Sequence, residues 1–134
     1  MKMNKAQAYK IENENFLKSL SQEEGILSLP KGILYKVIKS GNGISPTIQN
    51  IVSVFYKGTL INGRTFDNNI TQGYPDAFRL KELITGWQIA LTRMKVGDKW
   101  IIYIPSEMGY GSSGTSGIPK NSTLIFEIEL VSVA

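Results

Sequence analysis

The sequence predicts an α+β domain in which one short helix covers an antiparallel sheet. Short segments of alternating apolar residues recur from Ile26 onward, and an Asn-Gly pair at 62–63 joins two of them as a hairpin. Only one segment among these strands, Leu83–Met94, has helical periodicity. Because strands follow one another without intervening helices, the pattern differs from alternating βαβ units. A sheet with one solvated face must bury the other, and this helix is the expected cover.

Alternation and turn residues define the expected strands. In Ile51–Leu60 every second residue from Val52 is suited to a buried face. Asp67–Tyr74 is polar and contains glycine, which favours a loop or a bulge. The other expected strands are Ile26–Leu29, Ile33–Ile38, Arg64–Phe66, Ala77–Leu80, Lys99–Ile104 and Thr123–Val133.

Residues 4–20 are expected to form a helix that precedes the sheet. That helix fits two arrangements: packing against the chain's own domain, or a homodimer seam in which Asn13 sets the register. We therefore expect an N-terminal helical extension over residues 1–25 and one domain over residues 26–134. One face of the helix is formed by residues spaced three or four apart: Ala6, Tyr9, Asn13, Phe16 and Leu20.

Composition excludes several classes of function. The 134 residues include no cysteine and no histidine, which excludes disulfides, thiolate metal sites and histidine-based hydrolysis. The formal charge of +4 comes from scattered lysines and arginines, whereas nucleic-acid binding typically shows a clustered basic surface. We expect no metal, no cofactor and no nucleic-acid partner.

No stretch of the sequence reaches the length of a membrane span, and the start MKMNKAQAYK has no apolar region of a secretory signal behind it. We therefore expect no membrane insertion and a cytoplasmic location. A periplasmic location is the alternative if a leader has been removed.

The stretch GYGSSG at 109–114 has the G-x-G-x-x-G spacing of dinucleotide-binding loops. In those loops a helix follows and its N-terminus holds the pyrophosphate, but here the chain continues TSGIPKNST. Gly117 and Pro119 exclude a helix of useful length. The glycines instead predict a tightly turning loop that carries Tyr110 and Ile118 toward the sheet.

Four motifs follow one another along the domain. They read VSVFYKGTLINGRTFD (52–67), FRLKELITGW (78–87), MKVGDKWIIYIPSEMGYG (94–111) and IPKNSTLIFEIEL (118–130). Together they resemble the FKBP-type peptidyl-prolyl cis-trans isomerases over about Leu29–Val133. Within that family the chain looks most like the bacterial branch of macrophage infectivity potentiators, where a stretch similar to LPKGILYKV follows a helical extension.

The resemblance implies a five- or six-stranded antiparallel sheet wrapped around the short helix, with an aromatic pocket between them. Trp87 would form the floor of this pocket, and Leu83 and Ile84 would present their backbone to a ligand. Asp67 and Tyr110 match the polar groups at the rim and are the expected catalytic residues. The other residues expected to bind substrate are Tyr56, Phe66, Phe78, Ile118 and Phe126.

Two departures from the animal branch of the family concern inhibitors. An extra wall aromatic of that branch is missing near Asp76, and Thr115 and Ser116 change the long loop. These differences bear on the affinity for macrolide inhibitors more than on isomerase activity.

The resemblance predicts an enzyme that rotates X-Pro bonds in proline-containing polypeptides and assists protein folding. Such rotation requires no nucleophile, metal or cofactor, so it is compatible with a chain that lacks histidine. Each aromatic residue taken alone would be read as a core residue, and only their combination carries this prediction. The alternatives are a non-catalytic peptide-binding chaperone that uses the same groove, and a dimerisation module built on residues 4–20.

Overall fold

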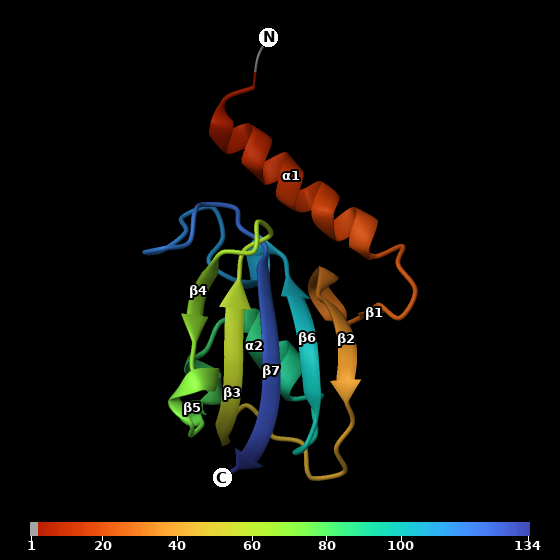
Figure 1. Cartoon of the computed structure of the whole chain (residues 1–134), viewed down its shortest axis with the longest axis vertical. Helices are drawn as coiled ribbons and strands as arrows, with labels where there is room; N and C mark the ends of the chain where they lie inside the picture. Colours follow the sequence, from red (N-terminus) through yellow and green to blue (C-terminus); the bar gives the residue numbers. More distant parts are fainter. Residues whose placement is uncertain (1–2) are drawn as a thin grey trace.

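The computed structural model describes residues 3–134 as one antiparallel sheet with a short helix against it and a longer N-terminal helix (Figure 1). The strand order is β1-β2-β6-β7-β3-β4, and β5 pairs with β3 beside β4. This confirms the predicted α+β class. The elements are α1 (Lys5–Leu20), β1 (Leu27–Ser28), β2 (Leu34–Lys39), β3 (Ile51–Thr59), β4 (Thr65–Asn68), β5 (Asp76–Arg79), α2 (Thr85–Leu91), β6 (Lys99–Ile104) and β7 (Leu124–Val133).

Six strands of four residues or more form the expected sheet, and β1 adds a seventh strand of two residues. The predicted strand at Ile26–Leu29 is thus shorter than expected. It pairs with β2, with Leu27 opposite Tyr35, across a turn at Pro30–Gly32.

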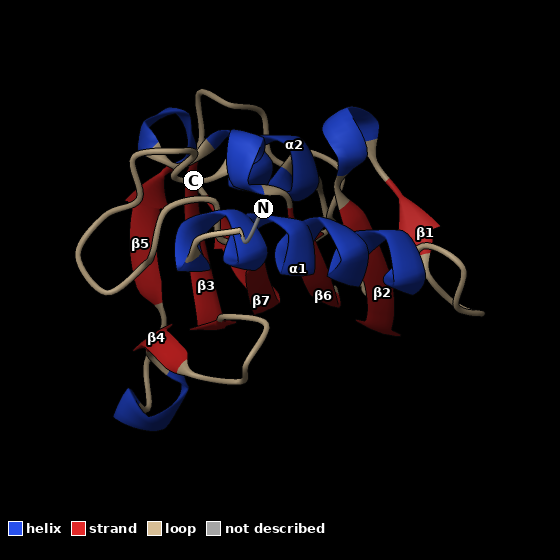
Figure 2. Cartoon of the chain, turned by 90° about the horizontal axis from the view of Figure 1, so that it is seen from above, coloured by secondary structure: helices blue, strands red, loops and turns tan. Residues whose placement is uncertain are grey.

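The core lies between α2 and one face of the sheet (Figure 2). The alternating residues of β3, β6 and β7 point into it, and Val52, Ile102 and Ile128 are fully buried. Helix α2 lies close to β6 because Gly86 has no side chain: a Cβ there would come within 2.6 Å of the Ile104 side chain. Burial of apolar surface at this contact is the main favourable contribution to folding.

The helix predicted over Leu83–Met94 is shorter in the structure, where α2 spans Thr85–Leu91. The backbone of Leu83 and Ile84 is extended, with ψ of 165° and 151°. The prediction of a helix was right but its bounds were wrong, because an apolar stripe does not report where the backbone leaves helical geometry. The extended pair now faces the pocket described below.

A second correction concerns the strand predicted at Arg64–Phe66. Strand β4 runs from Thr65 to Asn68, so Asp67 belongs to the strand and lies opposite Gly58, rather than beginning a loop. The polar composition of the segment hid this pairing, since β4 is an edge strand and exposes most of its residues.

Asn69 closes the gap between β4 and β5, which pair with different parts of the same edge of β3. Its side-chain oxygen accepts a hydrogen bond from the Tyr56 N–H at 2.7 Å, and its amide donates to the Val54 carbonyl at 2.9 Å. The amide also donates to the Asp76 carboxylate at 3.0 Å. Asn69 is 3 % exposed. Its side-chain amide supplies the donor and the acceptor that a neighbouring strand would otherwise give to this part of β3.

Helix α1 begins after Asn4, as predicted. The Asn4 side chain accepts from the Gln7 N–H at 2.8 Å, and the Gln7 side chain accepts from the Asn4 N–H at 3.1 Å. This reciprocal capping box satisfies two donors that a helix start leaves unpaired. No helix within residues 3–134 is both long and apolar enough to cross a membrane.

The predicted apolar face of α1 packs against the chain's own domain from Tyr9 to Leu20, at the end of the sheet where β2 and β7 begin (Figure 1). Ala6, also placed on this face, is exposed, because the first turns of α1 extend beyond the sheet. Asn13 and Leu20 are buried, and the Phe16 ring lies 6.3 Å from that of Tyr103. The structure therefore shows the first of the two arrangements expected for residues 4–20. Pairing with a second copy stays a prediction.

We expect Asn69→Ala to lower the free energy of unfolding by about 2–4 kcal/mol. The substitution leaves the Tyr56 N–H and the Val54 carbonyl unpaired at a buried edge. Urea unfolding measures this loss, with the exposed Asn42→Ala as the matched control. Equal midpoints for the two variants would contradict the role assigned to Asn69.

Candidate functional site

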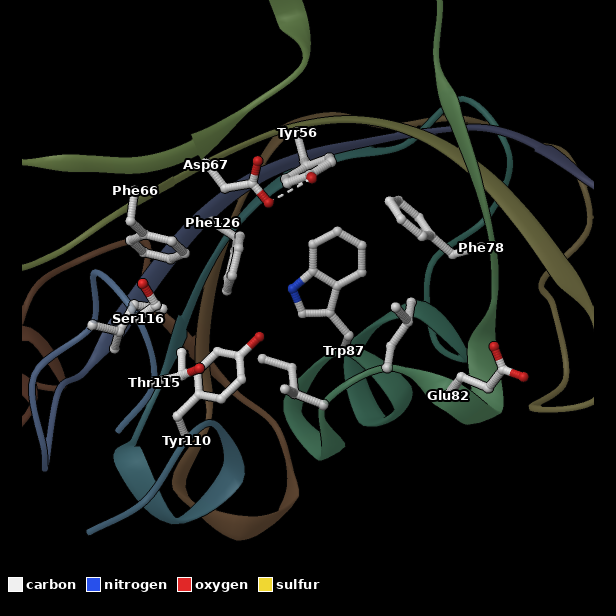
Figure 3. Close-up of a pocket in the computed structure, with 13 residues that line it drawn as sticks. Tyr56, Phe66, Asp67, Phe78, Glu82, Trp87, Tyr110, Thr115, Ser116 and Phe126 are labelled. Carbon is white, nitrogen blue, oxygen red and sulfur yellow. Dashed lines mark hydrogen bonds between the residues drawn. The ribbon is translucent and has the colours of Figure 1, made fainter. Parts of the chain in front are cut away.

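A pocket of about 430 Å³ opens between α2, the sheet and the loop of residues 109–121, which we call the long loop (Figure 3). Its size lies within the range of about 300–1,000 Å³ that is typical of small-ligand sites. The structure brings together all ten residues singled out from the sequence. They are Tyr56, Phe66, Asp67, Phe78, Leu83, Ile84, Trp87, Tyr110, Ile118 and Phe126.

Aromatic rings from three strands surround the Trp87 indole at the floor of the pocket. The ring centroids of Tyr56 and Phe126 lie 5.2 Å from Trp87, at interplanar angles of 84° and 90°. Phe78 lies 6.1 Å away at 89°, and Phe66 meets Phe126 edge to face at 5.5 Å. Edge-to-face pairs place the positive ring edge on a negative ring face, so the floor is both apolar and fixed in shape.

The Trp87 N–H is the one buried side-chain polar group within the described part of the chain, residues 3–134, that lacks a hydrogen-bond partner. Figure 3 shows the indole nitrogen pointing toward the Phe126 ring. The floor therefore presents one unpaired N–H donor among apolar rings.

Gly58 of β3 leaves room for two of these rings. A Cβ at this position would lie 2.6 Å from the Phe66 ring and 2.8 Å from the Phe126 ring. Any side chain here would displace the wall of the pocket. The requirement is one of space, because Gly58 has no positive φ. It pairs with β7 on one side and with β4 on the other, where the register shifts between Gly58 and Thr59.

The Tyr56 hydroxyl donates a 2.7 Å hydrogen bond to the Asp67 carboxylate. Burial raises the pKa of the Tyr56 hydroxyl above its usual value of 10.0, and the bond to the Asp67 carboxylate raises this pKa further. Tyr56 therefore stays protonated at neutral pH. Its bond fixes the Asp67 side chain at the rim, and the other carboxylate oxygen accepts from the Asn68 N–H at 2.9 Å.

One backbone donor and one hydroxyl donor lie at the opposite side of the pocket. Among residues 3–134, the Ile84 N–H donates to no acceptor, because the backbone is extended there and α2 starts one residue later. Tyr110 is 40 % exposed, and its hydroxyl points into the pocket (Figure 3). Both groups can donate to a carbonyl of a bound peptide.

Three lining residues were not predicted as site residues: Glu82, Thr115 and Ser116. All three are exposed. Glu82 ends a three-residue 3-10 helix and the other two lie in the long loop, so no periodic pattern marks them. With Asp67, Glu82 places a second carboxylate at the rim, and no lysine or arginine lines the pocket.

The long loop turns tightly, as its glycines predicted, and no helix follows GYGSSG. Thr115 and Ile118 exchange two backbone hydrogen bonds of 3.0 Å around a turn at Ser116-Gly117. The Arg64 guanidinium, from the β3–β4 hairpin, donates to the Gly117 carbonyl and ties this turn to the opposite wall. The spacing that resembles a dinucleotide loop therefore builds one side of an apolar pocket.

An antiparallel sheet wrapped on a short helix, with an aromatic pocket between them, is the architecture that the resemblance to the FKBP-type family implied. Residues 43–131 match the family described as FKBP-type peptidyl-prolyl cis-trans isomerase. The chain belongs to this family.

Relatives of known name agree with this assignment. The peptidyl-prolyl cis-trans isomerase Mip of Coxiella burnetii is 46 % identical over 88 % of this chain and 52 % of its own length. The FKBP-type isomerase FkpA of Escherichia coli is 42 % identical over 90 % of this chain and 44 % of its own length. The chain therefore spans about half the length of the curated relatives it matches.

Solved structures show the same fold. The crystal structure of FkpA from Escherichia coli matches 96 % of this chain and 60 % of its own, with a TM-score of 0.90 and 40 % identity. A peptidyl-prolyl isomerase from Pseudomonas syringae matches 100 % of this chain and 99 % of its own, with a TM-score of 0.90 and 33 % identity. The second match extends over the N-terminal helix as well as the sheet.

We expect Gly58→Ala to cost about 1–3 kcal/mol of stability and to weaken peptide binding, because the added methyl group pushes Phe66 and Phe126 out of place. Urea unfolding and peptide titration measure the two effects. Thr59→Ala, one residue along β3 and outside the pocket, is the control. Unchanged peptide affinity in a folded Gly58→Ala protein would contradict this account of the wall.

The raised pKa of Tyr56 makes a prediction about alkaline pH. Its contribution to the free energy of unfolding is complete below the unfolded-state pKa of about 10 and is lost as pH rises through the folded-state pKa. We expect wild type to lose more stability than Tyr56→Phe above about pH 10. Urea unfolding of both proteins in a pH series measures the difference, and parallel curves would show the prediction to be wrong.

Proposed function

We propose that this chain catalyses cis-trans isomerisation of X-Pro peptide bonds in polypeptides. The observation that carries the proposal is the apolar floor of edge-to-face aromatic rings beside a rim that carries the Tyr56–Asp67 pair. The family match and the names of the relatives support the same activity. We also propose that residues 26–134 form the isomerase domain and residues 1–25 its extension.

The barrier to be lowered is the resonance of the peptide bond, which costs about 18–20 kcal/mol to rotate. Uncatalysed X-Pro exchange takes about 10–100 s. Water stabilises the charge-separated planar amide, so transfer of the prolyl ring to a dry pocket raises the energy of the planar form relative to the twisted one. No covalent intermediate is required.

The residues divide this task between floor and rim. Trp87, Tyr56 and Phe126 cradle the prolyl ring and exclude water from it. The Ile84 N–H and the Tyr110 hydroxyl donate to substrate carbonyls on either side of the rotating bond. The Asp67 carboxylate is held at the rim by the Tyr56 hydroxyl. There it polarises the substrate carbonyl as the peptide bond rotates.

The proposed partners are proline-containing polypeptides, and a role in assisting folding follows from that substrate class. Binding of macrolide inhibitors stays a prediction, as does homodimer formation through residues 4–20. The dimer competes with the docking of α1 on its own domain, since both use the same face. Light scattering across a concentration series tests the dimer.

Two compartments were expected, and only one gains support. A relative from Legionella longbeachae, 39 % identical over 96 % of this chain, is named outer membrane protein MIP. We infer from this that the cell envelope is the location to test first, whereas the cytoplasmic expectation gains no support. Fractionation of cells that produce the natural gene product decides between the two.

The activity is tested by cis-to-trans exchange of a short X-Pro peptide. We expect wild type to accelerate the exchange, and Asp67→Ala and Tyr110→Phe each to lower kcat/KM by about three- to tenfold, the effect of one lost hydrogen bond. Tyr74→Phe is the matched control, because Tyr74 is 62 % exposed and lies outside the pocket.

No acceleration by folded wild type would refute the enzyme. If such a protein still bound the peptide, the alternative of a non-catalytic peptide-binding chaperone would hold. Equal losses in Tyr110→Phe and Tyr74→Phe would show that the rim hydroxyl has no special part in the reaction.

A further inference from the structure

We propose that helix α1 belongs to the framework of the catalytic pocket, and that Tyr9 and Asn13 are positioning residues for the long loop. The inference rests on the proposed function, since it concerns the same pocket. Figure 1 shows α1 crossing the end of the sheet beside the long loop, drawn in blue. Helix α1 contacts Ser122 and Thr123, the two residues that directly follow the long loop, and these lie more than a hundred positions further along the sequence.

The first contact is made by Asn13, whose side chain is 2 % exposed. Its oxygen accepts a 2.8 Å hydrogen bond from the N–H of Thr123, and its amide donates to the Tyr9 carbonyl at 2.8 Å. Thr123 lies just before β7 and is 1 % exposed. A buried backbone N–H needs an acceptor, and Asn13 supplies one at the point where the long loop enters the sheet.

The second contact is a directed chain of hydroxyl groups. The Tyr9 and Ser122 hydroxyls lie 2.8 Å apart, and the Ser122 hydroxyl donates to the Pro119 carbonyl at 2.7 Å. A serine hydroxyl has one proton, so Tyr9 must be the donor to Ser122. The chain therefore runs from α1 to Pro119, the neighbour of Ile118, which is 6 % exposed and lines the pocket.

These contacts bear on catalysis because the composition of the long loop allows it many conformations. It is rich in glycine and serine and largely exposed, so it has many alternative conformations when unrestrained. It also carries Tyr110 and Ile118, which must lie at defined positions around the prolyl ring. Arg64 holds the tip of the loop, and Tyr9 and Asn13 hold its end from α1. Loosening this end lowers the population of the arrangement that binds substrate.

The test compares Tyr9→Phe and Asn13→Ala with wild type in the full chain. We expect kcat/KM for the X-Pro peptide to fall about fivefold, mainly through KM, and the Ile118 and Asn121 amides to exchange hydrogen faster. Asn15→Ala is the matched control, because its side chain is exposed on the same helix. Phe16→Leu is a second control that weakens docking of α1 on Tyr103 without removing a contact to the loop.

The proposal is overturned if Tyr9→Phe keeps kcat/KM and KM within about twofold of wild type, a change below the loss of one hydrogen bond. It is also overturned if Phe16→Leu and Tyr9→Phe lose equal activity while hydrogen exchange at Ile118 stays at the wild-type rate in both, since the loss then does not act through the long loop. Tyr9→Phe decides the matter alone if Asn13→Ala does not fold.

Failure of the proposed function is distinguishable from failure of this inference. An inactive wild type refutes the enzyme, and hydrogen exchange in the long loop then tests positioning by itself. Faster exchange at Ile118 in Tyr9→Phe supports the framework role, and unchanged exchange overturns it.

Discussion

The packing of α2 against one face of the sheet is the contact on which both the fold and the pocket depend. Trp87 belongs to the buried core and also forms the pocket floor, so the residue that stabilises the domain shapes the site. The rings around it come from strands, whose positions the sheet fixes. A binding surface built on such elements is already ordered before a ligand arrives, which reduces the entropic cost of binding.

Strand β3 connects this packing to the chemistry at the rim. Its inward residues are core, its Tyr56 reaches Asp67, and its Gly58 leaves the space that two aromatic rings occupy. One edge pairs with β7, and the other is shared by β4, Asn69 and β5. The strand is therefore held on both sides, and the Tyr56 hydroxyl is placed by backbone geometry as well as by packing.

The two sides of the pocket differ in how they are held. The floor is held by close packing, whereas the long loop is held by single hydrogen bonds. Arg64 bonds the Gly117 carbonyl within the loop. Tyr9 and Asn13 bond the two residues that follow it, Ser122 and Thr123. Single hydrogen bonds contribute about 1 kcal/mol each, so this side opens more readily than the floor. The proposed polypeptide substrate fits such an arrangement, because a prolyl ring needs a rigid cradle while the flanking chain must enter and leave.

The sequence by itself determined the faces of β3, β6, β7 and α1, because burial of one face leaves a period of two or of three to four residues. It also excluded a nucleotide at GYGSSG, since Pro119 forbids the necessary helix. The ten pocket residues followed from the order of four motifs rather than from any local pattern, and the structure brings them together. Tertiary structure alone decided the extended backbone at Ile84 and the insertion of Asn69 beside β3. It also decided the hydrogen bond between the Tyr9 and Ser122 hydroxyls. These depend on contacts between separate segments, and such contacts leave no periodic trace in the residues that make them.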